Sequence, residues 1–219
     1  VDSQGDILAA MRAGFDAVGE PVPAREAILG MVGLSLDIGV PLLAPHLPRT
    51  AHDQIVAGYK AAYGSRRADQ GVAASAPLYP DARAVLDSLH AVPEMLLGVA
   101  TGKSARGLAK LMEGHALEGY FVTRQVADHH PSKPHPAMLH AALDETGVAP
   151  ENAVMVGDTS YDMEMARAAG IRGIGVSWGY HAPEALGAAK AIARDFRDLA
   201  RLLDAHGYGH GRRHSLGPA

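Results

Sequence analysis

The sequence contains no cysteine, and this absence limits the chemistry that the chain can carry out. Without thiols there are no disulfide bonds and no thiolate ligands, so a bound metal must be held by oxygen or imidazole groups. A chain free of cysteine suits a reducing compartment, and we expect a cytoplasmic protein.

Long apolar runs and clusters of basic residues are also missing. No apolar stretch approaches the roughly 20 residues needed to span a bilayer, and no charged leader precedes one at the N-terminal end. The formal net charge of −4 does not indicate a basic surface that would bind nucleic acid or an anionic membrane. We therefore expect a small-molecule ligand and no nucleic acid or membrane partner, in a monomer or homodimer.

The composition is that of a globular chain, with 47% hydrophobic and 20% charged residues among 219. This length fits one α/β domain with a small additional domain. The first third has helical character: apolar residues recur with helical period over 2–18, and Ser3 with Asp6 resembles a capping box. A second helix is expected near 24–31, and Gly30 to Gly33 predicts a loop. Residues up to about 76 contain no persuasive strand.

After Pro77 the pattern changes to alternating strands and helices, which predicts a parallel sheet with right-handed crossovers. Apolar runs predict strands at 95–100, 120–122, 153–156 and 173–176, and helical periodicity predicts helices at 81–89, 105–112, 136–146, 163–169 and 195–206. Residues 207–219 lack apolar periodicity and are expected to form a flexible tail.

Ligands of parallel sheets collect beyond the carboxyl ends of the strands, so the residues that follow each apolar run are candidates for a site. The first candidate is Thr101-Gly102-Lys103-Ser104. A hydroxyl, a glycine that allows close approach and the free N–H groups of a helix start together suit a phosphate group. The alternative is simple helix capping by Thr or Ser.

The second candidate is Lys133, in the proline-stiffened segment Ser132-Lys133-Pro134-His135-Pro136. A lysine held at a fixed place could offset negative charge on a carboxylate and a transferring phosphoryl group. The alternative is a solvated surface lysine.

The third candidate is the pair Asp158 and Asp162, which follows the apolar strand at 153–156. Two carboxylates four positions apart in a strand-to-helix turn can converge on Mg²⁺, which takes a few carboxylate oxygens together with water and phosphate oxygens. The alternative is a helix cap with a favourable first-turn charge. Since a helix and a strand fit between successive motifs, we expect all three motifs to reach one rim of the sheet.

These motifs resemble the second, third and fourth signatures of the haloacid dehalogenase superfamily, and most closely those of its phosphoglycolate phosphatase-like members. The resemblance runs from Val1-Asp2-Ser3, which matches the tail of the family's first signature, to Trp178-Gly179-Tyr180-His181. It implies a Rossmann-like core with a helical cap and a Mg²⁺-dependent phosphatase acting on a small phosphorylated metabolite through an aspartyl-phosphate.

The resemblance also implies a role for each candidate residue. Thr101 and Lys133 would be catalytic, with Thr101, Gly102 and Lys103 binding the phosphate of the substrate. Asp158 would be a magnesium ligand, and Asp162 would support the metal directly or through water.

The family's nucleophile and its acid/base residue are the two aspartates of the first signature, and both would lie upstream of Val1. Asp2 cannot replace them because it matches a later position of that signature. The first core strand would be absent as well. Omitting about six residues of a central strand forfeits hydrogen bonds of roughly 1 kcal/mol each, which rivals a domain's net stability of about 5–15 kcal/mol. We therefore expect an upstream segment that carries the strand, and an inactive chain without it.

The expected organisation is residues 1–9 as the end of the first motif, 10–76 as the cap, 77–206 as the core and 207–219 as the tail. Alternative functions are a sugar-phosphate mutase, another phosphatase specificity, a dehalogenase or a non-catalytic binder of phosphate and metal.

Within the cap, the Gly30 to Gly33 loop is the favoured substrate contact. Four residues of the following helix, Tyr59, Lys60, Arg66 and Arg67, are interpreted as a solvated face. A zinc site of loop and tail histidines is a weak alternative.

Overall fold

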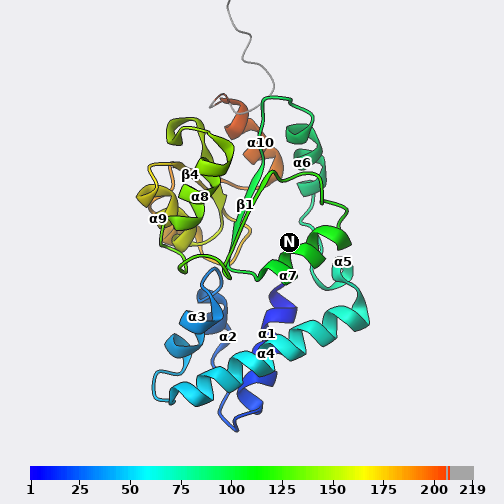
Figure 1. Ribbon diagram of the computed structural model, residues 1–219, viewed down its shortest axis with the longest axis vertical. Coiled ribbons are helices and arrows are strands. Elements are labelled where there is room, and N and C mark those ends of the chain that lie inside the picture. The colour runs from blue at the N-terminus through cyan, green and yellow to red at the C-terminus, as the bar shows by residue number, and fades with distance from the viewer. Residues whose placement is uncertain (206, 208–219) are drawn as a thin grey trace, which may run out of the picture.

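The computed structural model describes residues 1–205 and 207, and Figure 1 shows two parts, a helical layer below a mixed α/β part. The tail predicted at 207–219 lies, apart from Gly207, outside the described residues. The fold is the α/β class that the sequence predicts, with parallel strands flanked by helices. None of the described helices combines the length and apolarity that a bilayer crossing needs.

The helical layer is built from four helices and contains its own core. These are α1 (Gln4–Asp16), α2 (Arg25–Gly30), α3 (Leu36–Leu43) and α4 (Arg49–Gln70). Helix α1 lies against α4 in Figure 1, and the two backbones approach closely where Gly14 meets Gly58. A Cβ on Gly14 would lie 2.6 Å from the carbonyl oxygen of Ile55, so the close packing of these helices depends on glycine.

The α/β part follows a short helix, α5 (Val72–Ser75), and alternates helix and strand. Its helices are α6 (Ala82–His90), α7 (Ala105–Gly114), α8 (Ala137–Thr146), α9 (Ser160–Ala168) and α10 (Phe196–Ala205). Its strands are β1 (Gly98–Thr101), β2 (Thr123–Val126), β3 (Val154–Gly157), β4 (Arg172–Val176) and β5 (Ala191–Ala193). Two short 3₁₀ turns, Pro150–Asn152 and Pro183–Ala185, complete this part.

The strands form two separate parallel ladders. One joins β1 to β2, with Gly98 opposite Thr123, and the other has the order β3-β4-β5. Among the described residues no ladder connects β1 to β3. The two ladders are still held together, because Ala100 of β1 and Met155 of β3 both pack against one cluster that contains Met138 of α8.

The structure corrects several local predictions. The strands predicted at 95–100 and 120–122 begin three residues later, at Gly98 and Thr123, and β5 was not predicted. The capping box expected from Ser3 and Asp6 is wrong. Ser3 makes no capping hydrogen bond because its hydroxyl bonds to the hydroxyl of Tyr180 (2.9 Å), and the Asp6 carboxylate accepts from Arg66 (3.0 Å).

Candidate active site

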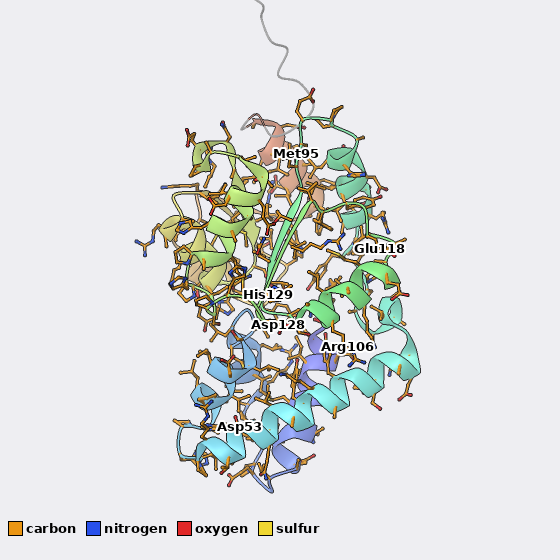
Figure 2. All side chains as sticks on the ribbon, in the orientation of Figure 1. Asp53, Met95, Arg106, Glu118, Asp128 and His129 are labelled. Carbon is orange, nitrogen blue, oxygen red and sulfur yellow. The ribbon has the colours of Figure 1, made fainter. Side chains whose placement is uncertain are left out.

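A cavity of about 1030 Å³ lies between the carboxyl ends of β1 and β3 and the facing surface of the helical layer. Thr101, Lys133, Asp158 and Asp162 all line it, although they come from three separate segments of the chain. This is the convergence that strand order predicts, since parallel strands present their carboxyl ends at one edge. Figure 2 shows the same edge through Asp128 and His129, which lie after β2 at the end of the core that faces the cap.

Thr101 ends β1 and stands at the entrance to helix α7. Its Oγ1 accepts a hydrogen bond from the backbone N–H of Lys103 (3.2 Å), and its side chain is partly exposed to the cavity. Capping of α7 falls instead to Ser104, whose hydroxyl accepts from the N–H of Gly107 (3.1 Å). The capping alternative therefore holds for Ser104, while Thr101 faces the cavity.

Lys133 is buried, with 6% of its side chain exposed, so the alternative of a solvated surface lysine is wrong. Its Nζ donates to Oδ1 of Asp162 (2.6 Å) and to the carbonyl oxygen of Ala100 (3.0 Å). A buried ammonium needs such partners, because an unpaired charge in the interior is costly. These two bonds use two of its three N–H groups and fix the ammonium beside the end of β1.

Asp162 organises the turn between β3 and α9. Its Oδ2 accepts from the backbone N–H groups of Asp158 and Thr159 and from the hydroxyl of Thr159, which in turn accepts from the N–H of Asp162. The result is a reciprocal capping box at the start of α9. Both carboxylate oxygens are thus bonded to protein donors, an arrangement that favours the indirect role for Asp162.

Asp158 is the partly buried carboxylate of the pair. Its Oδ2 accepts from the backbone N–H of Tyr180 (3.0 Å), in the loop that follows β4. That loop passes so close that a Cβ on Gly179 would lie 2.0 Å from the Cβ of Asp158. Only glycine allows this approach, which places the Trp178-to-His181 segment directly on the candidate metal ligand.

The pKa values of the two carboxylates are shifted in opposite directions. Burial, followed by the negative charge of Asp162, raises the pKa of Asp158. Burial also acts to raise the pKa of Asp162, but the charge and hydrogen bond of Lys133, with the bonds from Thr159, outweigh it and lower that pKa. The Tyr180 N–H and the Lys133 charge compensate the Asp158 carboxylate only in part, and a bound cation would offset the rest of its charge.

The loop between α2 and α3 closes the cavity from the cap side. Gly33 has φ +107°, and a Cβ on Gly102 would lie 3.0 Å from its carbonyl oxygen. The loop is tied to the core by the N–H of Ser35, which donates to the hydroxyl of Ser132 (2.9 Å), and by the hydroxyl of Tyr161, which donates to the carbonyl oxygen of Gly30 (3.2 Å). The loop expected to reach the site thus lies over Gly102.

Helix α4 also contributes to the cavity, and Tyr59 on the face interpreted as solvated is partly buried there, while Lys60 is exposed as that interpretation expects. Tyr59 and Lys60 line the cavity together with Val56 and Tyr63, at the spacing of one helix face. The hydroxyl of Tyr63 accepts from Nζ of Lys103 (3.3 Å), so cap and core meet here. The helical period of these positions was visible in the sequence, but not which face would be covered.

The remaining predicted candidates lie elsewhere. Arg66 bonds to Asp6 within the cap, and the side chain of Arg67 lies outside the described side chains. Within residues 1–205 and 207, no three His, Asp or Glu side chains gather closely enough to hold a metal ion, which gives no support to a zinc site. His206, His210 and His214 of the tail lie outside the described residues.

The fold and this pocket define a capped α/β protein with a hydroxyl, a buried ammonium and a carboxylate at the carboxyl edge of its strands. A family model described as haloacid dehalogenase-like hydrolase matches residues 1–176, which is most of the chain. The chain therefore belongs to the haloacid dehalogenase-like hydrolases, as the three motifs predict.

Known relatives cover nearly the whole chain. A phosphoglycolate phosphatase of Salmonella typhimurium is 28% identical and covers 93% of this chain and 88% of its own length. A probable phosphatase, IndB, of Dickeya dadantii is 31% identical, with coverages of 87% and 82%. Among solved structures, a haloacid dehalogenase-like family hydrolase from Streptococcus pneumoniae has a TM-score of 0.77 at 25% identity and covers 92% of both chains.

Proposed function

We propose that this chain is the cap and most of the core of a Mg²⁺-dependent phosphatase that hydrolyses a small phosphomonoester. The observation that carries the proposal is the meeting of Thr101, Lys133 and Asp158 around one cavity under a closed cap loop. A hydroxyl, an ammonium and a carboxylate are the groups needed to hold a phosphoryl group and a hard cation together.

In this proposal the end of β1 receives the phosphoryl oxygens. The Thr101 hydroxyl and the backbone of Gly102 and Lys103 line the cavity at the start of α7, where the positive end of the helix dipole favours anions. Lys133, already fixed by Asp162 and Ala100, directs its third N–H toward the same oxygens and offsets their charge. Because its position is set by bonds inside the protein, little reorganisation is needed when the substrate binds.

The residues present fit a magnesium ion. Asp158 has a carboxylate that accepts from the N–H of Tyr180 and a pKa raised by burial and by Asp162, so it would hold the ion, with Asp162 supporting the turn from the protein side. When bound, Mg²⁺ neutralises charge on the phosphoryl oxygens. One carboxylate is within the usual range, since Mg²⁺ sites in proteins commonly combine one or two carboxylates with water and phosphate oxygens.

The nucleophile is proposed to be an aspartate on a strand upstream of Val1 that pairs between β1 and β3. Two observations support this position. The edges of β1 and β3 share no ladder but line the same cavity, and Val156 of β3 is 36% exposed there although it belongs to an apolar strand. A strand inserted between them would pair both edges and bring its carboxyl end beside Thr101, Lys133 and Asp158.

Phosphoglycolate is the proposed type of substrate, because the Salmonella relative that matches almost the whole chain is a phosphoglycolate phosphatase. At 28% identity another small phosphoester, or a mutase reaction that returns the phosphoryl group to a sugar, fits the same pocket. The alternative to an enzyme is a protein that binds phosphate and metal without catalysing a reaction.

One assay separates these functions. The chain extended by its natural upstream segment is incubated with phosphoglycolate, other small phosphoesters and a sugar phosphate, with and without Mg²⁺, and both inorganic phosphate and isomerised sugar phosphate are measured. We expect Mg²⁺-dependent phosphate release from at least one ester. Isomerised sugar without net phosphate release would indicate a mutase, and binding without either product would indicate the non-catalytic binder.

A further inference from the structure

The imidazole of His181 connects the cap to the core at the edge of the site. Its Nε2 lies 3.0 Å from the carbonyl oxygen of Gly30, at the end of α2 in the cap, and its Nδ1 lies 3.1 Å from the backbone nitrogen of Ser160, at the start of α9. A backbone N–H only donates and a carbonyl oxygen only accepts. The ring therefore has the neutral form with its proton on Nε2, and it donates to the cap while it accepts from the core.

The carbonyl oxygen of Gly30 accepts a second hydrogen bond from the core. The hydroxyl of Tyr161 donates to it (3.2 Å), and the rings of Tyr161 and His181 meet edge to face with centroids 5.3 Å apart. Gly30 ends α2, and the last carbonyl groups of a helix have no partner within that helix. Two adjacent core side chains thus bind one carbonyl group of the cap, and we call this contact of Gly30, Tyr161 and His181 the cap latch.

The cap latch is joined to the turn that carries Asp158. The backbone N–H of His181 donates to the carbonyl oxygen of Asp158 (3.1 Å), and the N–H of Tyr180 donates to the Asp158 carboxylate (3.0 Å). The Tyr180 side chain packs against the apolar cluster of the cap, and its hydroxyl bonds to that of Ser3. This short segment contacts the candidate metal ligand through its backbone and the cap through its side chains.

The latch lies beside the loop that covers the phosphate end of the cavity. In Figure 1 the loop between α2 and α3 reaches the underside of the α/β part. Gly33 of this loop approaches the start of α9, where an added Cβ would lie 3.3 Å from the ring of Tyr161. Beyond Gly33, the N–H of Ser35 donates to the hydroxyl of Ser132 in the core. The loop is therefore held on both sides, by the latch at Gly30 and by the bond at Ser35.

We infer that His181 is a positioning residue, which holds the cap loop over the phosphate end of the site through its hydrogen bond to Gly30. His181 is not among the residues that line the cavity, so it acts through the loop and not on the substrate. The inference goes beyond the proposed function, because it names the group that keeps the cap loop closed. It rests on that function only for the effect on turnover.

Hydrogen exchange at the Ser35 amide measures how often the loop leaves the core, because this N–H donates across the junction to Ser132. The experiment uses the chain with its upstream segment and compares His181→Asn with His181→Gln. The Asn side chain can place its oxygen near the position of Nδ1 and accept from Ser160, but it is too short to reach Gly30. The longer Gln side chain can place its amide near the position of Nε2 and donate to Gly30.

We expect exchange at Ser35 to be about fivefold faster in His181→Asn than in the parent chain, as the loss of one hydrogen bond predicts, and to return toward the parent rate in His181→Gln. Tyr161→Phe removes the other bond to Gly30 and should act similarly. His140→Asn is the matched control, because His140 is exposed on α8 and does not line the cavity. Exchange at the parent rate in His181→Asn, or equally fast exchange in the Asn and Gln variants, overturns the inference.

Turnover provides the second measurement. When a loop must be closed for catalysis, a smaller closed fraction weakens apparent binding, and saturating substrate restores the closed form. In the double variant Tyr161→Phe/His181→Asn we therefore expect KM for the hydrolysed ester to rise about fivefold or more, with kcat nearly unchanged. An unchanged KM contradicts the positioning role. If the extended chain hydrolyses no ester, the proposed function fails, and exchange at Ser35 still decides whether the latch holds the loop.

Discussion

Lys133 and Asp162 form a buried ion pair, with 2.6 Å between Nζ and Oδ1, that connects the loop after β2 to the first turn of α9. The pair also links the two ladders, since Lys133 bonds to Ala100 at the open edge of β1 while Asp162 holds the turn after β3. It therefore fixes the geometry of the pocket across the place where the sheet is divided.

Replacing one partner of this pair should be strongly destabilising. In Asp162→Asn the Lys133 ammonium stays buried without a carboxylate, and the acceptor of three bonds in the turn loses its charge. We expect the free energy of unfolding to fall by about 3–5 kcal/mol, measured by urea denaturation.

The matched control is Asp53→Asn. Asp53 pairs with Arg49 on α4 at 4.0 Å, and the two side chains are 70% and 93% exposed, so its loss should change stability by less than about 1 kcal/mol. Similar small effects for both variants would show that the Lys133–Asp162 pair is dispensable.

Asp158 should behave in the opposite way, because in the proposed function its carboxylate binds the metal and its charge does not stabilise the fold. In Asp158→Asn the repulsion by Asp162 is removed, and the side-chain oxygen can still accept from Tyr180. We expect the variant to be at least as stable as the parent chain without Mg²⁺, and to lose Mg²⁺-dependent turnover when tested in the extended chain.

Thermal unfolding tests the same prediction without an activity assay. A ligand that binds only the folded state at about 100 times its Kd adds about 2.7 kcal/mol of stability, so Mg²⁺ should raise the Tm of the parent and leave the Asp158→Asn variant unchanged. An equal rise in both proteins would remove Asp158 from the metal site.

Gly102→Ala tests the contact between the cap loop and the phosphate end of the site. The added Cβ would lie 3.0 Å from the carbonyl oxygen of Gly33 and 3.1 Å from that of Leu34, so the loop must shift outward. We expect kcat/KM of the extended chain to fall roughly tenfold with little change in Tm. Gly119→Ala, where a Cβ would meet nothing within 4 Å, should leave both unchanged.

Asp81 offers a test of backbone strain remote from the site. It lies before α6 with φ +62°, a left-handed conformation that favours glycine, and its carboxylate accepts from Arg197 of α10 (2.9 Å). Asp81→Ala keeps the left-handed backbone and loses the bond, so it should be less stable than Asp81→Gly by about 1 kcal/mol in urea denaturation. Equal stability of the two variants would mean that the positive φ has no cost.

The site was more predictable from the sequence than the contacts around it. Thr101 and Asp158 directly follow apolar runs, and parallel strands bring such positions to one edge whatever the details of packing, while Lys133 was predicted from its proline-stiffened loop. The strand starts were predicted three residues too early because Met95 to Leu97 and Tyr120 to Val122 continue the apolar pattern ahead of β1 and β2. Strand β5 is only three residues long and gave no periodic signal.

Other features depend on distant partners that no local pattern reveals. Ser3 looks like a helix cap, but its hydroxyl bonds to Tyr180, 177 positions away. Tyr59 and Lys60 were interpreted as part of a solvated helix face. They line the cavity because α4 packs over the site. From the sequence, Asp162 was interpreted as supporting the metal directly or through water. The three groups that donate to it in the turn become visible only in the structure.

The most direct test of the account is to identify the residue that becomes phosphorylated. The extended chain is mixed with phosphoglycolate and Mg²⁺, quenched in acid during turnover, digested and analysed by mass spectrometry. The account predicts a phosphoryl group on an aspartate upstream of Val1, in a segment that pairs between β1 and β3. A phosphoryl group on a residue within 1–219, or turnover without any phosphorylated residue, would contradict it.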